Sequence, residues 1–272
     1  MPRLIRVALE KAKVKGVTSG VDVIGDIAIV RLTGLSAIQE SRVARSLLAE
    51  MKNVKVVMEQ EGGIQGEYRL RKLRHVAGEK RTLTVHKENG CLFKVDVARC
   101  YFSPRLSTER LRVAREVKRR EKVLNMFAGV GPFSIEIAKT SGAKVTSCEV
   151  NRFAAKLHEE NNAKNKVADV VRVIQDDAKN LPDLVDGKFD RILMPYPAYS
   201  DQFLKVALKL VKKGGVIHYY RHLLGRNEIE AASALREELS SLLPPDSKYA
   251  ARKVREVGPR WIEMVAEIGR RP

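Results

Sequence analysis

The sequence has little of what membrane proteins, secreted proteins and metalloproteins require. It contains no run of 18 apolar residues, and its first residues, MPRLIRVALEKAK, lack the apolar core of a signal peptide. The three cysteines, Cys91, Cys100 and Cys148, are odd in number and lack metal-ligand spacing, so we expect free thiols in a reducing compartment. These absences predict a cytoplasmic protein without a membrane span or a metal site.

Positive charge, in contrast, is in large excess. The chain has 51 Lys and Arg against 33 Asp and Glu, a net charge of +18. Residues 69–122 hold 17 basic and 6 acidic side chains and supply +11 of that charge. This concentration favours nucleic acid as a partner. A heat-adapted surface would scatter both signs, and a membrane-binding segment would need an amphipathic helix with a broad aromatic face, which this stretch lacks.

Two patterns of secondary structure divide the chain. In the first third, DVIGDIAIVRL and NVKVVMEQ are predicted strands, SRVARSLLAEM a helix, and TLTVHKENGCLFKVDV a hairpin that turns at Asn89-Gly90. From about residue 121, β-branched apolar runs alternate with helical stretches, which predicts a parallel sheet covered by helices on both faces. We therefore expect an α/β protein: a small α+β domain over residues 1–118 and a Rossmann-like domain over residues 119–272, connected by the helix STERLRVAREVKRREK.

The segment NMFAGVGPFS has the features of a nucleoside-binding loop. It follows a predicted strand and opens a helix, and Gly129 and Gly131 let the backbone approach a ligand at the helix N-terminus. The next strand ends in Glu149, suited to the two ribose hydroxyls, and the third ends in Asp176-Asp177, either of which suits an adenine amino group. The loop lacks the Lys and the third Gly of phosphate-binding motifs. This order resembles the class I S-adenosylmethionine-dependent methyltransferases, so we expect S-adenosylmethionine as the cofactor.

Two basic clusters precede the sheet domain. GEYRLRKLRHVAGE carries Arg69, Arg71 and Arg74, a pattern that a solvated loop facing phosphate would share. DVARCYFSPRLSTERLR places two aromatic residues and an arginine ahead of a helix start, with Glu109 in its first turn. A carboxylate there also simply complements the helix dipole.

Three segments carry a resemblance to a known family. HKENGCLFKVDVARCYFSPRLSTERLR, NMFAGVGPFSIEIA and GGVIHYY strongly resemble the archaeal and eukaryotic tRNA (guanine-37-N1)-methyltransferases, from about Gly66 to Tyr220. The resemblance implies a class I methyltransferase domain preceded by a smaller RNA-contacting domain. It also implies methyl transfer to ring nitrogen 1 of the guanosine that follows the anticodon, with tRNA as the partner and no evident obligate protein partner.

The resemblance also implies roles for individual residues. Glu109 matches the family's proton acceptor at ring nitrogen 1, and Arg69 matches the donor to the guanine 6-oxo group. The base and the neighbouring backbone are expected to be held by Tyr101, Arg105 and Arg110, and the base to stack on Tyr101 or Tyr196. The expected cofactor-binding positions are Phe127, Gly129, Gly131, Glu149, Asp177 and Met194.

The sequence departs from the family pattern at three places. Pro195 stands where the family has an Asn that helps bind guanine, which leaves only backbone carbonyls of Met194 to Tyr196 to accept from the base's amino group. Asn125 replaces an Asp at the end of the first strand of the catalytic domain. The segment before Gly66 is too short for the additional N-terminal domain that reads the tRNA elbow in many members.

Other functions stay open at this point. Wyosine-pathway enzymes on the same fold methylate carbon 7 of a tricyclic guanosine derivative or transfer an aminocarboxypropyl group, and the latter also lack the Asn that Pro195 replaces. A catalytically silent RNA-binding paralogue would not need Glu109, Arg69 and Glu149 together. A methyltransferase acting on protein or small molecules would not explain the basic segment.

Overall fold

The computed structural model describes residues 3–12, 14, 20–245 and 247–270. It consists of two compact units, Met1–Ser107 and Thr108–Pro272. The boundary predicted from the sequence, after residue 118, would assign helix α3 (Ser107–Glu116) to the first domain, whereas nearly all of this helix belongs to unit 2. In the described part of the chain, no helix has both the length and the apolarity to cross a membrane.

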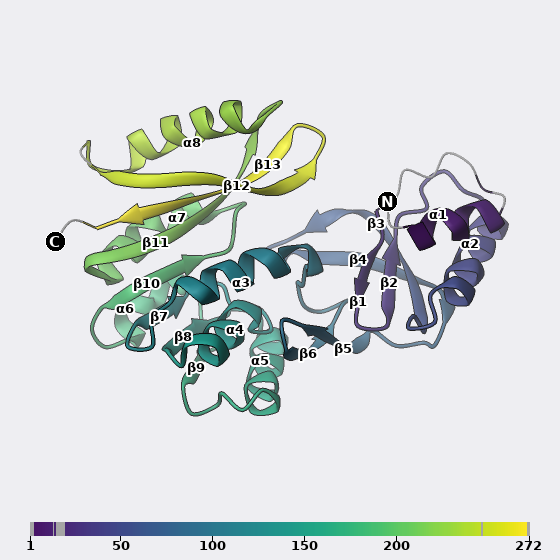
Figure 1. The fold of residues 1–272 in the computed structure, drawn as a ribbon, viewed down its shortest axis with the longest axis horizontal. Coiled ribbons are helices and arrows are strands. Elements are labelled where there is room, and N and C mark those ends of the chain that lie inside the picture. The colour runs from purple at the N-terminus through teal and green to yellow at the C-terminus, as the bar shows by residue number, and fades with distance from the viewer. Residues whose placement is uncertain (1–2, 13, 15–19, 246, 271–272) are drawn as a thin grey trace. The chain divides into compact units, whose positions relative to one another are not determined.

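Unit 1 contains a four-stranded sheet, two helices and a separate two-stranded hairpin (Figure 1). The sheet order is β1-β2-β3-β4, with β2 and β3 parallel and the outer pairs antiparallel. The elements of unit 1 are α1 (Arg3–Lys11), β1 (Asp22–Ile24), β2 (Ile27–Val30), α2 (Ala37–Glu50), β3 (Val56–Gln65), β4 (Leu70–Gly78), β5 (Leu83–Glu88), β6 (Cys91–Asp96) and η1 (Pro104–Leu106).

Helix α2 forms where its apolar spacing predicts and covers the sheet of unit 1. A capping box between Ser36 and Gln39 satisfies its first backbone N–H groups. Val43, Ala44 and Leu47 lie one turn apart and are buried in a core shared with β2 and α1. Burial of this apolar stripe holds the helix on the sheet.

The segment DVIGDIAIVRL was predicted as one strand but forms a hairpin. Gly25 adopts a φ of 57° and turns the chain between β1 and β2. A Cβ at this position would lie 2.1 Å from Thr84 Oγ1 and 2.6 Å from the Val85 carbonyl oxygen, so the close approach of the β5 backbone also requires glycine. The turn is attached to β5 by Asp26, whose carboxylate accepts from Arg81 and from the Thr84 hydroxyl.

The Asn89-Gly90 hairpin is confirmed. Both residues have positive φ, 46° and 74°, which is the geometry that a two-residue turn between twisted strands needs. Asn89 also donates through its side chain to the carbonyl and hydroxyl of Ser107. The hairpin therefore supports the chain just before α3.

Unit 2 is built on a seven-stranded sheet in the order β12-β13-β11-β10-β7-β8-β9. The first five strands in the chain follow the doubly wound order 3-2-1-4-5 and are parallel, as predicted, and β12 and β13 complete one edge antiparallel. Its strands are β7 (Lys122–Asn125), β8 (Lys144–Cys148), β9 (Val171–Ile174), β10 (Phe189–Met194), β11 (Val211–Leu224), β12 (Lys248–Gly258) and β13 (Trp261–Gly269). Its helices besides α3 are α4 (Pro132–Ser141), α5 (Arg152–Lys164), η2 (Ala178–Asn180), α6 (Leu181–Leu184), α7 (Ser200–Leu210) and α8 (Glu228–Leu242).

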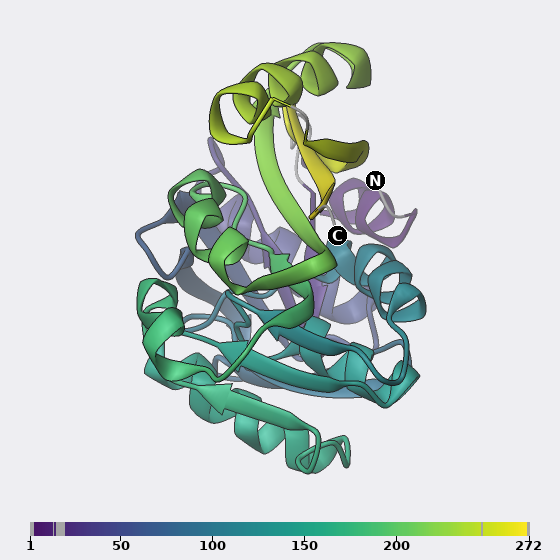
Figure 2. The same cartoon turned by 90° about the vertical axis from the view of Figure 1, so that its left-hand side faces the viewer.

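The two faces of this sheet are separated by the alternation of side chains along β11. Tyr219 points into a core formed with α6, α7 and α8, and α8 packs on β11, β12 and β13 (Figure 2). Its neighbour Tyr220 points to the opposite face, where it contacts Phe133 of α4 and Glu109 of α3. The sheet thus carries an apolar core on one side and a buried polar group on the other.

Candidate active site

The carboxyl ends of β7 and β10 are the natural position for a ligand site in unit 2. These strands are neighbours at the point where the strand order reverses, and ligands of doubly wound sheets bind there. The loop after β7 carries Phe127, and the loop after β10 carries Tyr196; their ring centroids are 5.0 Å apart. The structure therefore brings together two segments that the sequence assigned separately to cofactor and substrate.

The glycine loop has the backbone conformation that its sequence predicts. Gly129 and Gly131 have φ of 56° and 91°, and Gly131 precedes the first turn of α4. A Cβ at Gly131 would lie 2.2 Å from the His158 ring, which fills the space behind the loop. Asn125, at the end of β7, donates from its side-chain amide to Ser134 and accepts from the Phe127 N–H, so it anchors both ends of the loop.

Two acidic residues at strand ends complete the cofactor-binding candidates. Glu149 follows β8 and accepts from the Gly129 N–H at 2.6 Å and from the Asn151 N–H at 2.9 Å. Asp177 follows β9 and caps η2 through the Lys179 N–H. These hydrogen-bond acceptors fit a nucleoside, because carboxylates that can accept from hydroxyl and amino groups lie beside a glycine loop without a phosphate-binding lysine.

The cysteine at the end of β8 is held as a neutral thiol. Cys148 is buried, and its burial, with the charges of Glu149, Asp176 and Asp177, raises the pKa of the thiol to about 12. The three cysteines form no disulfide with one another, as expected from the sequence, and the structure buries all three.

The loop after β10 holds the expected substrate positions Pro195 and Tyr196. The carbonyl of Met194 accepts from the Tyr196 N–H and the Ser200 hydroxyl, and the carbonyl of Tyr196 accepts from the Tyr199 N–H and the same hydroxyl. The Ser200 hydroxyl has one proton, which the two carbonyls share, and each of these carbonyls also accepts from a backbone N–H. Among the three carbonyls expected to receive a base's amino group, the one with no hydrogen bond in the described structure is that of Pro195.

In unit 1, the structure brings Arg69 and Tyr101 together. The guanidinium carbon of Arg69 lies 4.5 Å from the centroid of the Tyr101 ring, a cation–π contact. Arg69 has a φ of 53°, rare outside glycine, in the turn between β3 and β4. The turn thus presents this arginine beside the aromatic ring, and the contact of either residue with a base stays a prediction.

Other arginines of the basic segment have acidic partners. Asp22 pairs with Arg105 at 2.7 Å and with Arg71 at 2.9 Å. Arg74 pairs with Glu40, Glu59 and Glu61. Arg105 remains about half exposed, which suits its expected contact with a substrate, whereas Arg71 is held inside unit 1.

Glu109 lies in a buried polar group on the second face of the unit 2 sheet. Its carboxylate receives two hydrogen bonds from Arg112, one from the Tyr220 hydroxyl at 2.7 Å and one from Arg252 of β12. Burial raises the pKa of Glu109, but the hydrogen bonds from these three residues outweigh it and lower the pKa below its usual value. None of the three donors was singled out from the sequence. Arg252 is 143 residues from Glu109, and no local spacing marks it.

Arg110, the next residue, is buried rather than presented to solvent. Its side chain is 2% exposed, and its Nε lies 3.5 Å from a carboxylate oxygen of Glu136 in α4. A direct contact with substrate, which the resemblance implies, stays a prediction. The geometry described here is that of an ion pair joining α3 to α4.

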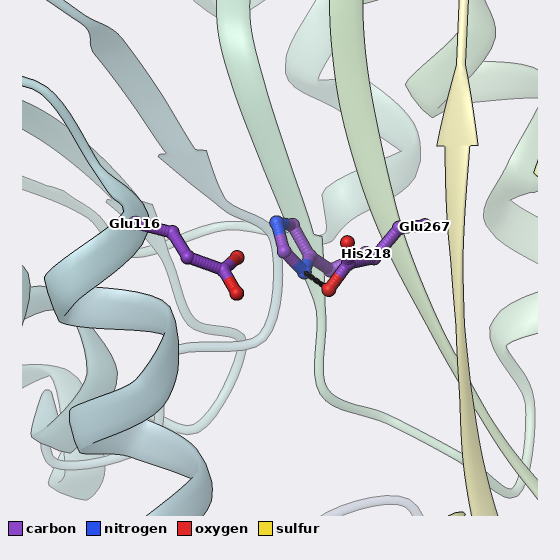
Figure 3. A group of neighbouring side chains, drawn as sticks. All are labelled: Glu116, His218 and Glu267. Carbon is purple, nitrogen blue, oxygen red and sulfur yellow. Dashed lines mark ion pairs between the residues drawn. The ribbon is translucent and has the colours of Figure 1, made fainter. Parts of the chain in front are cut away.

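A cluster beside Glu109 has the composition of a metal site. Glu116, His218 and Glu267 point toward one another, and their ligand atoms lie within 4.8 Å (Figure 3). Arg112 Nη1 bridges Glu116 and Glu267, and Arg191 Nη1 donates to His218 Nε2 at 2.6 Å. Burial, with the charges of Arg191, Arg112 and Arg252, lowers the pKa of His218 well below its usual value, so the ring stays neutral. Guanidinium groups thus supply the positive charge that a metal ion would provide.

Comparisons with known proteins agree with this architecture. The TRM5/TYW2 methyltransferase domain matches residues 84–240, and the TYW2 N-terminal domain matches residues 2–82. The tRNA (guanine(37)-N(1))-methyltransferase Trm5b of Pyrococcus abyssi is 45% identical over 199 residues, which cover 73% of this chain and 58% of that protein. The chain thus spans less than two thirds of the length of this relative.

Two further similar proteins are covered by this chain over a larger share of their own length. The tRNA 4-demethylwyosine(37)-methyltransferase Taw21 of Saccharolobus solfataricus is 35% identical over 251 residues, covering 91% of this chain and 92% of that protein. The solved complex of aTrm5 and tRNALeu has a TM-score of 0.79 at 33% identity and covers 92% of this chain and 72% of that one. With a domain match over more than half of its residues and a relative aligned over nearly its whole length, the chain belongs to the TRM5/TYW2 family of S-adenosylmethionine-dependent methyltransferases.

Proposed function

We propose that this protein methylates the base at position 37 of tRNA, and that the acceptor is ring nitrogen 1 of guanosine. The observation that supports this most is the 45% identity to a tRNA (guanine(37)-N(1))-methyltransferase across the segment that contains Glu109 and the glycine loop. The anticodon region is then the part of the RNA that the protein recognises, and the relative solved with tRNALeu supports RNA binding by the same architecture.

The residues at the strand ends of unit 2 fit S-adenosylmethionine. Glu149 and Asp177 would hold the ribose and the adenine, while Phe127, Gly129, Gly131 and Met194 would line the site. The bound cofactor supplies a methyl group on a positively charged sulfonium. The loop after β10 lies beside the glycine loop after β7, so a base held by Tyr196 and Pro195 would lie next to the bound cofactor.

The proposed roles of Glu109 and Arg69 follow from the chemistry of guanine. Ring nitrogen 1 carries a proton at neutral pH and is a poor nucleophile until that proton leaves. Glu109 accepts the proton, and Arg69 stabilises the negative charge that develops on the 6-oxo group. Loss of either group should lower the rate on the order of 10²- to 10³-fold. Tyr101 and Arg105 hold the base and its neighbouring backbone, and Arg110 positions α3 through Glu136.

A second candidate is methylation of carbon 7 of 4-demethylwyosine at the same position. Two observations favour it: Taw21 is covered over 92% of its length, and Pro195 offers only a carbonyl where a guanine-binding Asn is expected. A tricyclic base has lost the free amino group of guanine, so it does not need that Asn side chain.

Mass spectrometry of nucleosides distinguishes the two candidates. Unmodified tRNA and tRNA carrying 4-demethylwyosine at position 37 are incubated separately with the protein and labelled S-adenosylmethionine. A methyl group on guanosine 37 supports nitrogen 1, and a methyl group on the tricyclic base alone supports carbon 7. An aminocarboxypropyl product, or no product on either RNA, contradicts both. Glu109→Gln should slow formation of the product on the order of 10²- to 10³-fold. Glu237→Gln, which changes an exposed carboxylate of α8, is the matched control and should form product at the wild-type rate.

A further inference from the structure

The acceptor capacity of Glu109 is filled in this structure. An ionised carboxylate offers about four lone-pair positions. The described residues supply four donors: Arg112 Nε and Nη2, at 3.1 and 2.9 Å, the Tyr220 hydroxyl at 2.7 Å, and Arg252 Nη2. A carboxylate in this state has no position left for the proton of a base. One donor must leave before Glu109 can perform the role proposed above.

Two of the three donor residues are fixed in place. Arg112 lies one turn after Glu109 on α3, and it also binds Glu116 and Glu267 of the cluster in Figure 3. Tyr220 is 1% exposed in the middle of the sheet and packs against the ring of Phe133. Removing either of them would break several buried contacts at once.

Arg252 is held differently. It extends from the edge strand β12, its side chain is 36% exposed, and its only ion pair in the described structure is the one to Oε2 of Glu109. Its Nε is buried and has no hydrogen-bond partner among the described residues. A buried donor without a hydrogen-bond partner destabilises the conformation that buries it. Moving Arg252 away from Glu109 should therefore cost less free energy than moving Arg112 or Tyr220.

We propose that Arg252 is a displaceable donor: it occupies the acceptor position at Oε2 of Glu109 in the RNA-free protein and moves onto an oxygen of the RNA when substrate binds. The oxygen is a phosphate or carbonyl oxygen, both of which a guanidinium binds well. The move exposes Oε2 just when a base is present. The base then gives its ring proton to Oε2 and gains the methyl group, while the sulfonium becomes a neutral thioether. Arg252 is therefore a positioning residue, and its role rests on the proposed function of Glu109.

The electrostatics of Glu109 agree with this role. The groups that face its carboxylate are Arg112 on its own helix, Tyr220 of β11 and Arg252 of β12, with Glu267 of β13 beyond Arg112. Hydrogen bonds from the first three keep the pKa low. Loss of one of them raises the pKa toward the range in which a carboxylate is an effective base.

The first test follows Glu109 directly and does not depend on catalysis. The side-chain carboxyl of Glu109 is titrated by carbon-13 NMR, with and without unmodified tRNA and in the absence of cofactor. The pKa of Glu109 should rise when tRNA binds the wild-type protein and should already be raised in RNA-free Arg252→Gln, with no further rise on adding tRNA. Lys253→Gln, which removes a neighbouring surface charge, should behave as wild type. If bound tRNA leaves the wild-type value unchanged, Arg252 is a fixed clamp and the proposal is wrong.

The second test separates binding from chemistry. Arg252→Gln should raise the KM for tRNA about 10-fold and lower the salt dependence of binding by about one ion, because one charged contact to RNA is lost. The single-turnover rate at saturating tRNA, and its pH profile, should stay within about threefold of wild type. Arg252→Lys should restore part of the affinity. A 10-fold fall in the saturated rate would show that Arg252 acts on Glu109 during the reaction and would overturn the proposal.

The two tests also distinguish this inference from the proposed function. Full activity of Glu109→Gln would remove Glu109 as the base, whatever Arg252 does. Failure of tRNA to bind at all would reject the RNA substrate itself. Melting curves identify any variant that fails to fold. If Arg252→Gln fails to fold, Arg252→Lys is compared with the wild-type protein instead.

Discussion

The buried histidine behind the glycine loop gives the most quantitative prediction. His158 is fully buried on α5, and both ring nitrogens lack a hydrogen-bond partner among the described residues. Burial alone lowers its pKa to about 3 from an ordinary 6.5. Below pH 6.5 the His158 imidazole binds a proton in the unfolded chain but stays neutral in the folded chain. The free energy of unfolding of the wild-type protein should therefore decrease as the pH falls from about 6.5 toward 3.

The magnitude follows from this difference in pKa. At pH 7 the effect is on the order of 0.2 kcal/mol, and at pH 5 it is roughly 2 kcal/mol, from 1.36 kcal/mol for each pH unit over which the two states differ in protonation. In a unit of this size, about 2 kcal/mol corresponds to a Tm change of roughly 4–8 °C. His158→Leu removes the titration and fills the site with an apolar side chain. We therefore expect the variant to equal or exceed wild-type stability at pH 7 and to exceed it clearly at pH 5.

Urea unfolding at the two pH values measures this directly. The single tryptophan of the chain, Trp261, begins β13 and reports on unit 2 by its fluorescence. His75→Leu in unit 1 is the control, because the His75 ring bonds the Gly78 carbonyl within that unit and its loss should leave the transition of unit 2 unchanged. If the stability difference between wild type and His158→Leu is the same at pH 7 and pH 5, the imidazole is not held neutral, and the reasoning fails.

Three further predictions concern the glycine loop, the first unit and RNA. Gly131→Ala should destabilise unit 2 and weaken S-adenosylmethionine binding, because its Cβ would overlap the His158 ring; adding His158→Ala should recover part of the loss in both melting and cofactor titration. Asp26→Asn should lower the stability of unit 1 by about 1 kcal/mol, because it weakens the bonds to Arg81 and Thr84. The Arg81 hydrogen bond lowers the pKa of Asp26, so this contribution is present above about pH 4 and is lost below it; equal melting of variant and wild type at pH 7 would refute it. Binding of tRNA should weaken steeply with salt, on a log–log plot with a slope of several ions, whereas a shallow slope would contradict the role of the basic segment.

Much of the fold was predictable because local sequence and tertiary structure agree. The parallel strands of unit 2, helix α2 and the Asn89-Gly90 turn form where apolar periodicity and turn residues place them. The errors have local causes as well. Gly25 interrupts an apolar run that otherwise resembles one strand, and only the close approach of β5 reveals why it is glycine. Helix α3 ends at Glu116, ahead of the basic run that the sequence assigned to it.

The candidate site was predictable only as far as its residues are close in sequence. Gly129, Gly131 and Glu149 lie at the ends of consecutive strands, so their proximity follows from a parallel sheet. The state of Glu109 did not follow, because Tyr220 and Arg252 reach it from strands more than 100 residues away. Sequence periodicity identifies which face of an element is buried, but it does not identify the side chain that lies opposite.

The position of β12 in the sheet has a consequence for motion. This strand lies at the edge, bonded to β13 alone, and its register shifts between Lys253 and Arg255, immediately after Arg252. Edge segments with irregular pairing open at lower free energy than central strands, often without unfolding the rest of a domain. Backbone amides of β12 should therefore exchange with solvent faster than those of β11. In the proposed displacement, an edge strand of this kind lets Arg252 move onto the RNA while Arg112 and Tyr220 stay in place.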